Sequence, residues 1–265
     1  MQFTVSKIVL FSLFVACISV LPARAADRLG QVLETKELRV CIWPGYFSIT
    51  YQNPRTQLLE GIDIDMAKAL AKHLGVGLKF VDSSFARLIN NMTTDACDVA
   101  MHGVGIRESR KAYMDFTQPH LVSGIYAVVD KQNSDIREWA DIDQPGVVVV
   151  VQKSTYMEPV MRDYLKHAEL SVVNSFKARE QEVQSGRADV FMTDYPYGKR
   201  MVSLTEWASL LAPSEPLAPT PYAYAVPKGD KQWLKTVDEF VSLVKADGRL
   251  KAAAVKHGLS PIVAD

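Results

Sequence analysis

Five consecutive valines at residues 147–151 constrain the fold of this chain more than any other feature. Side chains branched at Cβ favour strands, and an apolar run without polar interruption indicates a strand buried on both faces. A polar turn follows, and Met157, Val160, Met161 and Tyr164 then recur at helical spacing. The segment therefore predicts a strand, a turn and a helix, which is the repeating unit of an α/β fold.

Strand and helix patterns alternate along most of the chain, so we expect parallel sheets flanked by helices. In the first half, strands are predicted over 37–42, 77–81 and 98–101, with helices over 63–74 and 85–92. A second unit begins near residue 123 and predicts further strands over 123–129, 171–173, 189–193 and 222–226, with helices over 178–185 and 232–246. Two α/β units side by side leave a cleft between them, which is the default ligand site.

The first residues do not contribute to this fold. An apolar run over 8–20 follows Lys7 and precedes Ala-Arg-Ala at 23–25. The run is shorter than the roughly 20 residues that span a bilayer, and the flanks are typical of a secretory signal peptide. We expect cleavage after Ala25 and a soluble exported protein.

Charge and motif content narrow the classes of function. Thirty basic and thirty acidic residues cancel, so no global field indicates nucleic acid or an anionic membrane as partner. The five histidines lie far apart without carboxylate or cysteine neighbours at ligand spacing, so no metal site is expected. No nucleophile elbow, phosphate-binding glycine loop or nucleotide fingerprint occurs, so we expect no cofactor. A small-molecule ligand or a protein partner remains.

The cysteines indicate the compartment. Cys17 leaves with the signal peptide, so Cys41 and Cys97 remain. An even pair in an oxidising compartment predicts a disulfide, with two buried free thiols as the alternative. A sheet with the strand order 2-1-3 would place the end of the first strand beside the start of the third, although the two sulfurs would need a local offset to meet.

Polar and aromatic residues stand at the predicted strand ends, where open α/β sheets bind their ligands. Arg110 follows the third strand, and Asp194 follows the strand over 189–193. The hydroxyl residues Ser154 and Thr155 follow the valine strand. The aromatic residue Tyr46 follows the first strand, and Phe85 follows the second. A cation, an anion, hydroxyls and two rings are what a zwitterionic amino acid requires.

Several short motifs occur in a fixed order: Glu-Leu-Arg-Val at 37–40, Gly-Ile-Asp-Ile-Asp at 61–65, Gly-Ile-Arg-Glu-Ser-Arg at 105–110, Met-Asp-Phe-Thr-Gln-Pro at 114–119, Gly-Arg-Ala-Asp-Val-Phe-Met-Thr-Asp at 186–194 and Ala-Asp-Gly-Arg-Leu at 246–250. In this order they resemble the bacterial periplasmic solute-binding proteins of family 3, which bind polar amino acids, and the resemblance covers essentially all of the mature chain.

The resemblance implies a type II periplasmic binding fold, with two lobes that each hold a mostly parallel sheet flanked by helices. Residues 26–123 and 222–265 would form the first lobe, and residues 124–221 the second. The chain would cross between them near 123–126 and 220–224 and close by a hinge on an amino acid or related carboxylate. A periplasmic monomer that delivers its ligand to an ABC transporter is the implied function, with no enzymatic activity.

The resemblance also implies roles for single residues. Arg110 matches the arginine that forks onto the ligand's α-carboxylate, and Asp194 matches the acceptor of its ammonium group. Thr155, with Ser154 as the lesser candidate, matches a hydroxyl residue whose backbone holds the carboxylate, and Tyr46 with Phe85 would sandwich the side chain. The structural alternatives are pairing of Arg110 with Glu108, capping of a turn by Asp194, an N-cap at Thr155 and a core role for both rings.

Departures from the family affect the expected specificity. Gly103 and Gly105 stand where relatives often present serines, so hydroxyls are lost while backbone N–H groups remain. Trp43 stands where binders of basic amino acids carry an aspartate. Both changes favour an uncharged or aromatic amino acid, or a similar carboxylate. Arg107 replaces a small hydroxyl residue and is expected to be solvated or to act at the mouth of the cleft.

Two other functions remain open. One relative of these binders is an enzyme, cyclohexadienyl dehydratase, which this sequence resembles at 141–147 and 192–194. That enzyme carries a glutamate where this chain has Tyr197, so the proton donor of an elimination would have to be a tyrosine. The two cysteines also resemble those of periplasmic accessory proteins of quinoprotein alcohol dehydrogenases, whose cleft would hold protein or nothing.

Overall fold

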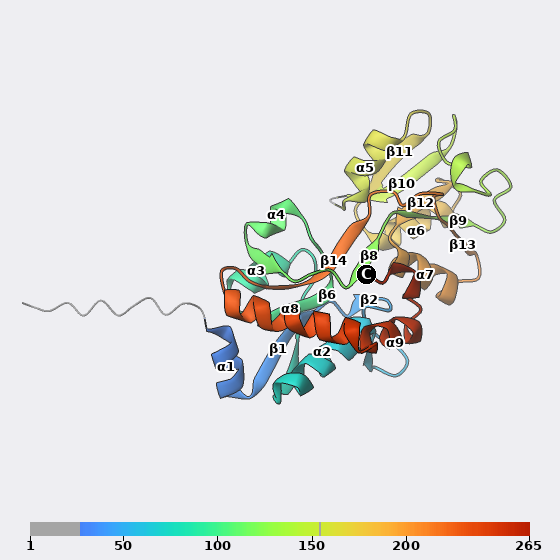
Figure 1. Ribbon diagram of the computed structural model, residues 1–265. Helices are drawn as coiled ribbons and strands as arrows, with labels where there is room; N and C mark the ends of the chain where they lie inside the picture. The colour runs from blue at the N-terminus through green and yellow to red at the C-terminus, as the bar shows by residue number, and fades with distance from the viewer. Residues whose placement is uncertain (1–26, 154) are drawn as a thin grey trace, which may run out of the picture.

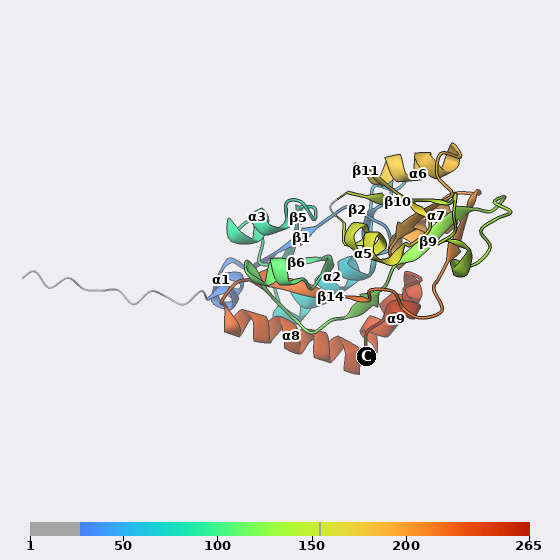
Figure 2. The same ribbon diagram turned by 90° about the horizontal axis from the view of Figure 1, so that it is seen from above.

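The computed structural model describes residues 27–153 and 155–265, so the predicted signal peptide and Ser154 lie outside the described residues. The chain forms two α/β bodies side by side, one around β1, β6 and α8 and the other around β10, β12 and α6 (Figure 1). The view from above shows the same two groups joined near β8 and β14 (Figure 2). Within the described ranges, no helix is both long and apolar enough to cross a membrane.

The first sheet has the strand order β5-β1-β6-β14-β7, and β8 also pairs with β14. β1 runs parallel to β5 and β6, whereas β14 is antiparallel to its neighbours. The strands are β1 (Glu37–Ile42), β5 (Gly77–Asp82), β6 (Val99–Gly105), β7 (Met114–Phe116), β8 (Leu121–Ser123) and β14 (Thr220–Pro227). The order of the first three strands is the predicted 2-1-3.

Helices cover both faces of the first sheet. One face packs against α1 (Arg28–Thr35), α2 (Ile62–Leu74), α8 (Lys231–Ala246) and α9 (Arg249–Lys256) in the largest hydrophobic cluster. The other face packs against α3 (Leu88–Thr93) in a smaller cluster that contains both cysteines. The helix predicted over 85–92 therefore begins later, at Leu88, which leaves Phe85 in the loop after β5.

The second sheet has the order β11-β10-β12-β9-β13. Its strands are β9 (Tyr126–Asp130), β10 (Val148–Gln152), β11 (Glu169–Val173), β12 (Val190–Thr193) and β13 (Ala208–Leu211). α5 (Met157–Tyr164) packs on one face, and α6 (Phe176–Gln184) and α7 (Tyr195–Leu204) pack on the other. The middle three valines of β10 are fully buried, as a strand covered on both faces requires.

The remaining elements are short. β2 (Gly45–Tyr46), β3 (Thr50–Gln52) and β4 (Leu59–Glu60) form a small antiparallel sheet. α4 (Glu108–Lys111) follows β6, and two 3-10 turns complete the described chain at Trp139–Asp141 and Ser260–Ile262.

The α/β class predicted from the sequence is confirmed, but both sheets are mixed rather than mostly parallel. In each sheet, three consecutive strands from one edge are parallel, and the strand that joins the two bodies lies antiparallel beside them. β9 and β14 enter their sheets from a crossing between the bodies instead of from a helix on the same sheet. The direction of these two strands therefore depends on the connection, which local sequence patterns do not contain.

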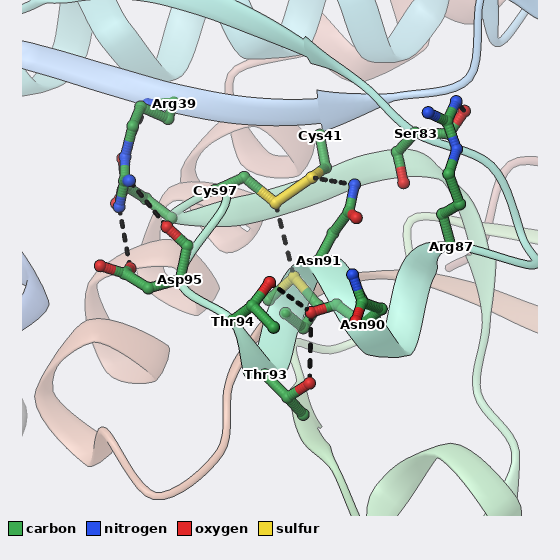
Figure 3. Close-up of a disulfide and its surroundings, with 12 residues drawn as sticks. Arg39, Cys41, Ser83, Arg87, Asn90, Asn91, Thr93, Thr94, Asp95 and Cys97 are labelled. Carbon is green, nitrogen blue, oxygen red and sulfur yellow. Dashed lines mark hydrogen bonds and ion pairs between the residues drawn. A yellow bond between two sulfur atoms is a disulfide. The ribbon is translucent and has the colours of Figure 1, made fainter.

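The predicted disulfide joins Cys41 in β1 to Cys97 just before β6, with 5.6 Å between the two Cα atoms (Figure 3). The register supplies the offset that the sulfurs need, because Val40 pairs with Val99 and Cys97 therefore precedes the paired part of β6. Asn91 of α3 points its Nδ2 at Cys41 Sγ from 3.7 Å. Both cysteines are fully buried, so the bond fastens α3 and two central strands together.

Candidate functional site

A cavity of about 430 Å³ lies where the two sheets face each other. Its lining comes from the carboxyl ends of β1, β5 and β6 in the first sheet and of β10 and β12 in the second, together with the first part of β14. Parallel strands that end at one edge bring their following residues together, which is how α/β folds build ligand sites. The volume suits a small molecule.

Asp194 caps a helix, which is one of the two roles that the sequence left open, and it also lines the cavity. It is the N-cap of α7, where its Oδ1 accepts a hydrogen bond of 3.1 Å from the Tyr197 N–H. Its Oδ2 accepts hydrogen bonds from the hydroxyls of Tyr46 and Tyr222, the second at 3.0 Å. The side chain also lines the cavity, with 9% of the residue exposed. Capping the helix and facing the cavity are therefore compatible functions of one carboxylate.

Tyr46 lines the cavity as a buried wall residue. Only 3% of it is exposed, and its hydroxyl is committed to Asp194. Burial, and next to it the Asp194 charge, raises the pKa of the Tyr46 phenol well above its usual value, so the hydroxyl stays protonated and donates. Its ring meets Phe85 edge-on at 5.7 Å between centroids.

Tyr222 was not identified from the sequence, which showed only a strand at this position. The register of β14 against β6 shifts between Ala223 and Ala225. On one side of this bulge Tyr222 lines the cavity, and on the other Tyr224 lies against His120, with 4.3 Å between the ring centroids. An irregularity of this kind depends on the partner strand, so period-two alternation alone does not reveal it.

An aromatic wall closes one side of the cavity. Trp43 after β1 stacks on Phe176 at the start of α6, with 5.7 Å between centroids and 24° between the ring planes. Phe176 in turn stacks on Tyr197 at 5.0 Å. Phe85 meets Trp43 edge-on at 5.4 Å. Trp43 and Phe85 thus lie where the sequence predicted, whereas Phe176 was missed because the predicted helix began at 178 and excluded it.

Arg110 lines the cavity and has no carboxylate partner among the described residues. Its Nη1 donates to the Gly105 carbonyl oxygen at 2.8 Å, and its guanidinium carbon lies 5.5 Å from the Phe85 ring centroid. Glu108, the alternative partner, pairs with Lys111 at 2.6 Å instead. Burial, and then the neighbouring Arg107 charge, lowers the pKa of Arg110 to about 10. The guanidinium is still charged at neutral pH.

Arg107, which the sequence placed in solvent or at the mouth of the cleft, lines the cavity. It is half-buried, and its guanidinium carbon lies 5.1 Å from the Tyr156 ring centroid, next to α5 of the other body. The short helix α4 begins directly after Arg107, and Arg110 lies within its single turn. Residues three apart on a helical turn point the same way, so both arginines face the cavity.

Gly103 and Gly105 lack the hydroxyls that relatives often present at these positions, and close packing also requires a residue without a side chain at both. Gly103 has φ of 62°, and a Cβ there would lie 2.8 Å from Cε1 of the Tyr46 ring. Its N–H donates to Asp63 Oδ2 at 2.8 Å, so this N–H group is already used. A Cβ at Gly105 would lie 2.9 Å from Cγ2 of Thr220. Both glycines line the cavity and let neighbouring side chains approach β6.

Thr155 lines the cavity, but its polar groups point inward to its own turn. Its hydroxyl donates to the Gln152 carbonyl oxygen at 2.7 Å, and its N–H donates to the same oxygen at 3.3 Å. The N-cap of α5 is Tyr156, so Thr155 does not serve as a cap. Ser154, the other hydroxyl candidate, lies outside the described residues. Among the residues described, no group of three or more His, Cys, Asp or Glu side chains could hold a metal ion.

The sequence profile of the bacterial extracellular solute-binding proteins, family 3, matches residues 38–260. The chain belongs to this family. Similar proteins include cyclohexadienyl dehydratase of Pseudomonas aeruginosa, 28% identical over 241 residues and 89% of either chain. The L-cystine-binding protein of Escherichia coli K12 is 27% identical over 228 residues, which cover 86% of this chain and 85% of that protein.

Solved structures of similar proteins share the fold of this family 3 chain. An ancestral amino acid-binding protein, described as a precursor of cyclohexadienyl dehydratase, superposes with a TM-score of 0.74 at 30% identity and covers 86% of this chain and 98% of its own. A binding component of an ABC transporter from Wolinella succinogenes, complexed with lysine, gives a TM-score of 0.73 at 27% identity, with 83% and 95% covered. The predicted type II periplasmic binding fold is therefore confirmed.

Proposed function

We propose that this family 3 protein captures an amino acid or a related small carboxylate in the cavity between its sheets and delivers it to an ABC transporter. The observation that carries the proposal is that unlike charges line the same cavity. Arg110 has no carboxylate partner in the part of the chain that the structure describes, and Asp194 faces the same space from the other sheet. A guanidinium suits a carboxylate because two parallel hydrogen bonds can form.

A ligand would fit between these groups as follows. Its carboxylate would accept hydrogen bonds from Arg110. The guanidinium group has five N–H donors, and one of them donates to the Gly105 carbonyl oxygen. Its ammonium group would donate to Asp194, because a carboxylate offers about four acceptor positions and three are used by protein hydrogens. Its side chain would lie against the aromatic wall of Trp43 and Phe176.

We propose the lobes as residues 26–123 with 222–265 and residues 124–221, closing by a hinge at the two crossings. The crossings lie side by side, because the Ile125 N–H donates to the Leu217 carbonyl oxygen at 3.0 Å. Ser123 Oγ accepts from the Tyr195 N–H at 3.0 Å, which links the first crossing to the helix that Asp194 caps. Ligand contacts from both sheets would stabilise the closed state.

We further propose that the chain is exported, cleaved after Ala25 and active in the periplasm as a monomer. The buried disulfide between Cys41 and Cys97 supports an oxidising compartment.

The similarity to cyclohexadienyl dehydratase supports an alternative function, an enzyme that catalyses an elimination. An elimination needs a proton donor beside the leaving group. Tyr197 lines the cavity, but its hydroxyl donates to Glu180, which also pairs with Arg200 at 2.9 Å. Burial, and then the hydrogen bond to Glu180, raises the pKa of Tyr197, so release of its proton is disfavoured. These contacts favour binding over elimination.

The test is a ligand screen by thermal shift with amino acids and 2-keto acids. A ligand at about 100 times its dissociation constant adds roughly 2.7 kcal/mol to the free energy of unfolding. Arg110→Gln should remove the shift. The matched control is Arg87→Gln, which removes an exposed arginine that pairs with Asp82 away from the cavity. A panel without any shift, together with turnover of prephenate or arogenate, would replace the binding proposal with the enzyme.

A further inference from the structure

We propose that the natural ligand carries two carboxylates, one bound by Arg110 and the other by Arg107. This inference rests on the proposed function and defines its ligand class as small dicarboxylates, including acidic amino acids. The sequence favoured an uncharged or aromatic amino acid, or a similar carboxylate, so the second carboxylate is what this inference adds.

The charges that line the cavity are unbalanced. Three cations line it, Arg107, Arg110 and Lys153, whereas Asp194 is its only carboxylate among the described residues. Asp194 already accepts hydrogen bonds from two tyrosine hydroxyls and one N–H group, which leaves one acceptor position for a ligand. The cavity as a whole therefore favours a ligand with net negative charge, because opposite charges attract more strongly where water is excluded.

Among the described residues, neither arginine has an anionic partner. In residues 27–153 and 155–265, no Asp or Glu oxygen lies within 4.0 Å of the guanidinium nitrogens of Arg107 or Arg110. Arg110 uses one donor on the Gly105 carbonyl oxygen, and the Arg107 guanidinium lies over the face of the Tyr156 ring. A guanidinium has five N–H donors, so most of the donors of both side chains are free for a ligand.

The two guanidinium groups are close enough for one small molecule to reach both. A Cβ built on Gly105 would lie 3.7 Å from Arg110 Nη1 and 3.9 Å from Arg107 Nε. Both groups therefore stand around the same residue of β6. After burial, the Arg107 charge also lowers the pKa of Arg110, because the two like charges repel each other. A dianion bound to both would relieve this repulsion.

The space opposite the arginines is aromatic. Phe85 and Trp43 lie edge to face at 5.4 Å, and Phe176 stacks on Trp43. An apolar or ring-shaped body between the two carboxylates would therefore contact the wall while its charged ends bind the arginines. Asp194 favours an acidic amino acid over a dicarboxylate without an ammonium group, because only the amino acid offers this carboxylate a cationic partner.

The test uses pairs of ligands that differ in one charge but hardly in shape. The pairs are L-aspartate with L-asparagine, L-glutamate with L-glutamine, and 4-carboxy-L-phenylalanine with its 4-carbamoyl analogue, titrated by calorimetry. In at least one pair, the acid should bind at least tenfold more tightly than the amide. Glutarate is the probe without an ammonium group, and tighter binding of glutarate than of L-glutamate would assign the ligand to the simple dicarboxylates.

Variants then locate the second carboxylate. Arg107→Gln should weaken the acid to the level of its amide while changing the affinity for the amide less than threefold, which also shows that the variant is folded. Arg107→Lys keeps the charge and should retain part of the preference, and Arg87→Gln should behave as wild type.

Three outcomes would overturn the inference. If each amide binds as tightly as its acid, the ligand has one carboxylate, and the proposed binding function stands without this refinement. If Arg107→Gln keeps the full preference, the second carboxylate lies elsewhere. If no amino acid or dicarboxylate binds, both the proposed function and this inference are wrong.

Discussion

Asp63 and Asp194 are two buried carboxylates that the protein holds in opposite ways. Asp63 is fully buried within the body of the first sheet, where its Oδ1 lies 2.9 Å from His120 Nε2. Asp194 lies at the cavity, and tyrosine hydroxyls and one N–H group bind it instead of a cation. A basic side chain faces Asp63 from the protein itself, whereas the cation expected for Asp194 would come from a ligand.

Gly103 connects the two carboxylates. Its N–H donates to Asp63, and its Cα leaves room for the Tyr46 ring, whose hydroxyl donates to Asp194. Strand β6 therefore contacts the pair of Asp63 with His120 as well as the residues that line the cavity. Asp63 therefore supports the residues around the cavity, whereas Asp194 lines the cavity itself. Mutations at Asp63 should mainly change stability, and mutations at Asp194 should mainly change ligand binding.

The largest expected effect is at Asp63. Asp63→Asn leaves His120 buried without its carboxylate, and breaking a buried pair from one side typically costs about 3–5 kcal/mol in the free energy of unfolding. Urea denaturation measures this loss. The matched control is Asp65→Asn on the same helix, where the partly exposed carboxylate pairs with Lys256 and His257 and should contribute about 1 kcal/mol. Equal losses for both variants would show that the buried pair adds nothing.

His102, next to Gly103 on β6, should make stability depend on acid pH. Burial lowers the pKa of His102 to about 4, against the raising effect of the Asp63 charge. The unfolded chain binds this proton near pH 6.5 and the folded chain only near pH 4, so stability is present above pH 6.5 and is lost as the pH falls through this window. The loss is about 3 kcal/mol at 1.36 kcal/mol for each pKa unit.

Urea midpoints between pH 7 and pH 4 test this window. His102→Phe should lose less stability than wild type across it, because the variant has no proton to bind there. His73→Gln, which removes an exposed histidine on α2, should keep the wild-type profile. Parallel profiles for wild type and His102→Phe would contradict the assignment to His102.

The smallest expected effect on stability is at Asp194. Asp194→Asn keeps a side chain that caps helices well and an oxygen for the tyrosine hydroxyls, so the unliganded protein should lose only about 1 kcal/mol. Affinity for an amino acid should nevertheless fall at least tenfold, because the ammonium group loses its carboxylate. Calorimetry beside urea denaturation separates the two quantities. A stability loss as large as that of Asp63→Asn would remove the distinction between the two carboxylates.

Much of the site could be predicted from the sequence because it follows strand ends. Trp43, Phe85, Arg110 and Asp194 each come shortly after a strand that local patterns identified, and the cavity contains all four. Hydrophobic period and turn residues determine where a strand ends, and parallel strands end at one edge. This part of the site depends only on local sequence and on the order of strands.

The partners of these residues depended on contacts that no local pattern contains. Tyr46 and Asp194 are 148 residues apart and meet only because the two bodies face each other. Tyr222 reaches the same carboxylate from β14, where a register shift separates its position from that of Tyr224. Asp63 was predicted only as part of a helix start, and its pairing with His120 requires the packing of α2 beside β8.

By itself, the sequence determined the α/β class and the family, and it favoured a disulfide between Cys41 and Cys97 over two free thiols. The class follows from short-range periodicity, which reports which face of each segment is buried, the family follows from motif order, and the disulfide follows from the even number of cysteines in the mature chain. Only the tertiary structure decided that Arg107 joins Arg110 at the cavity and that both sheets are mixed. The reason is physical. Long-range packing determines the direction of a returning strand and which surfaces of the two bodies face each other, and each contact in that packing depends on all the others.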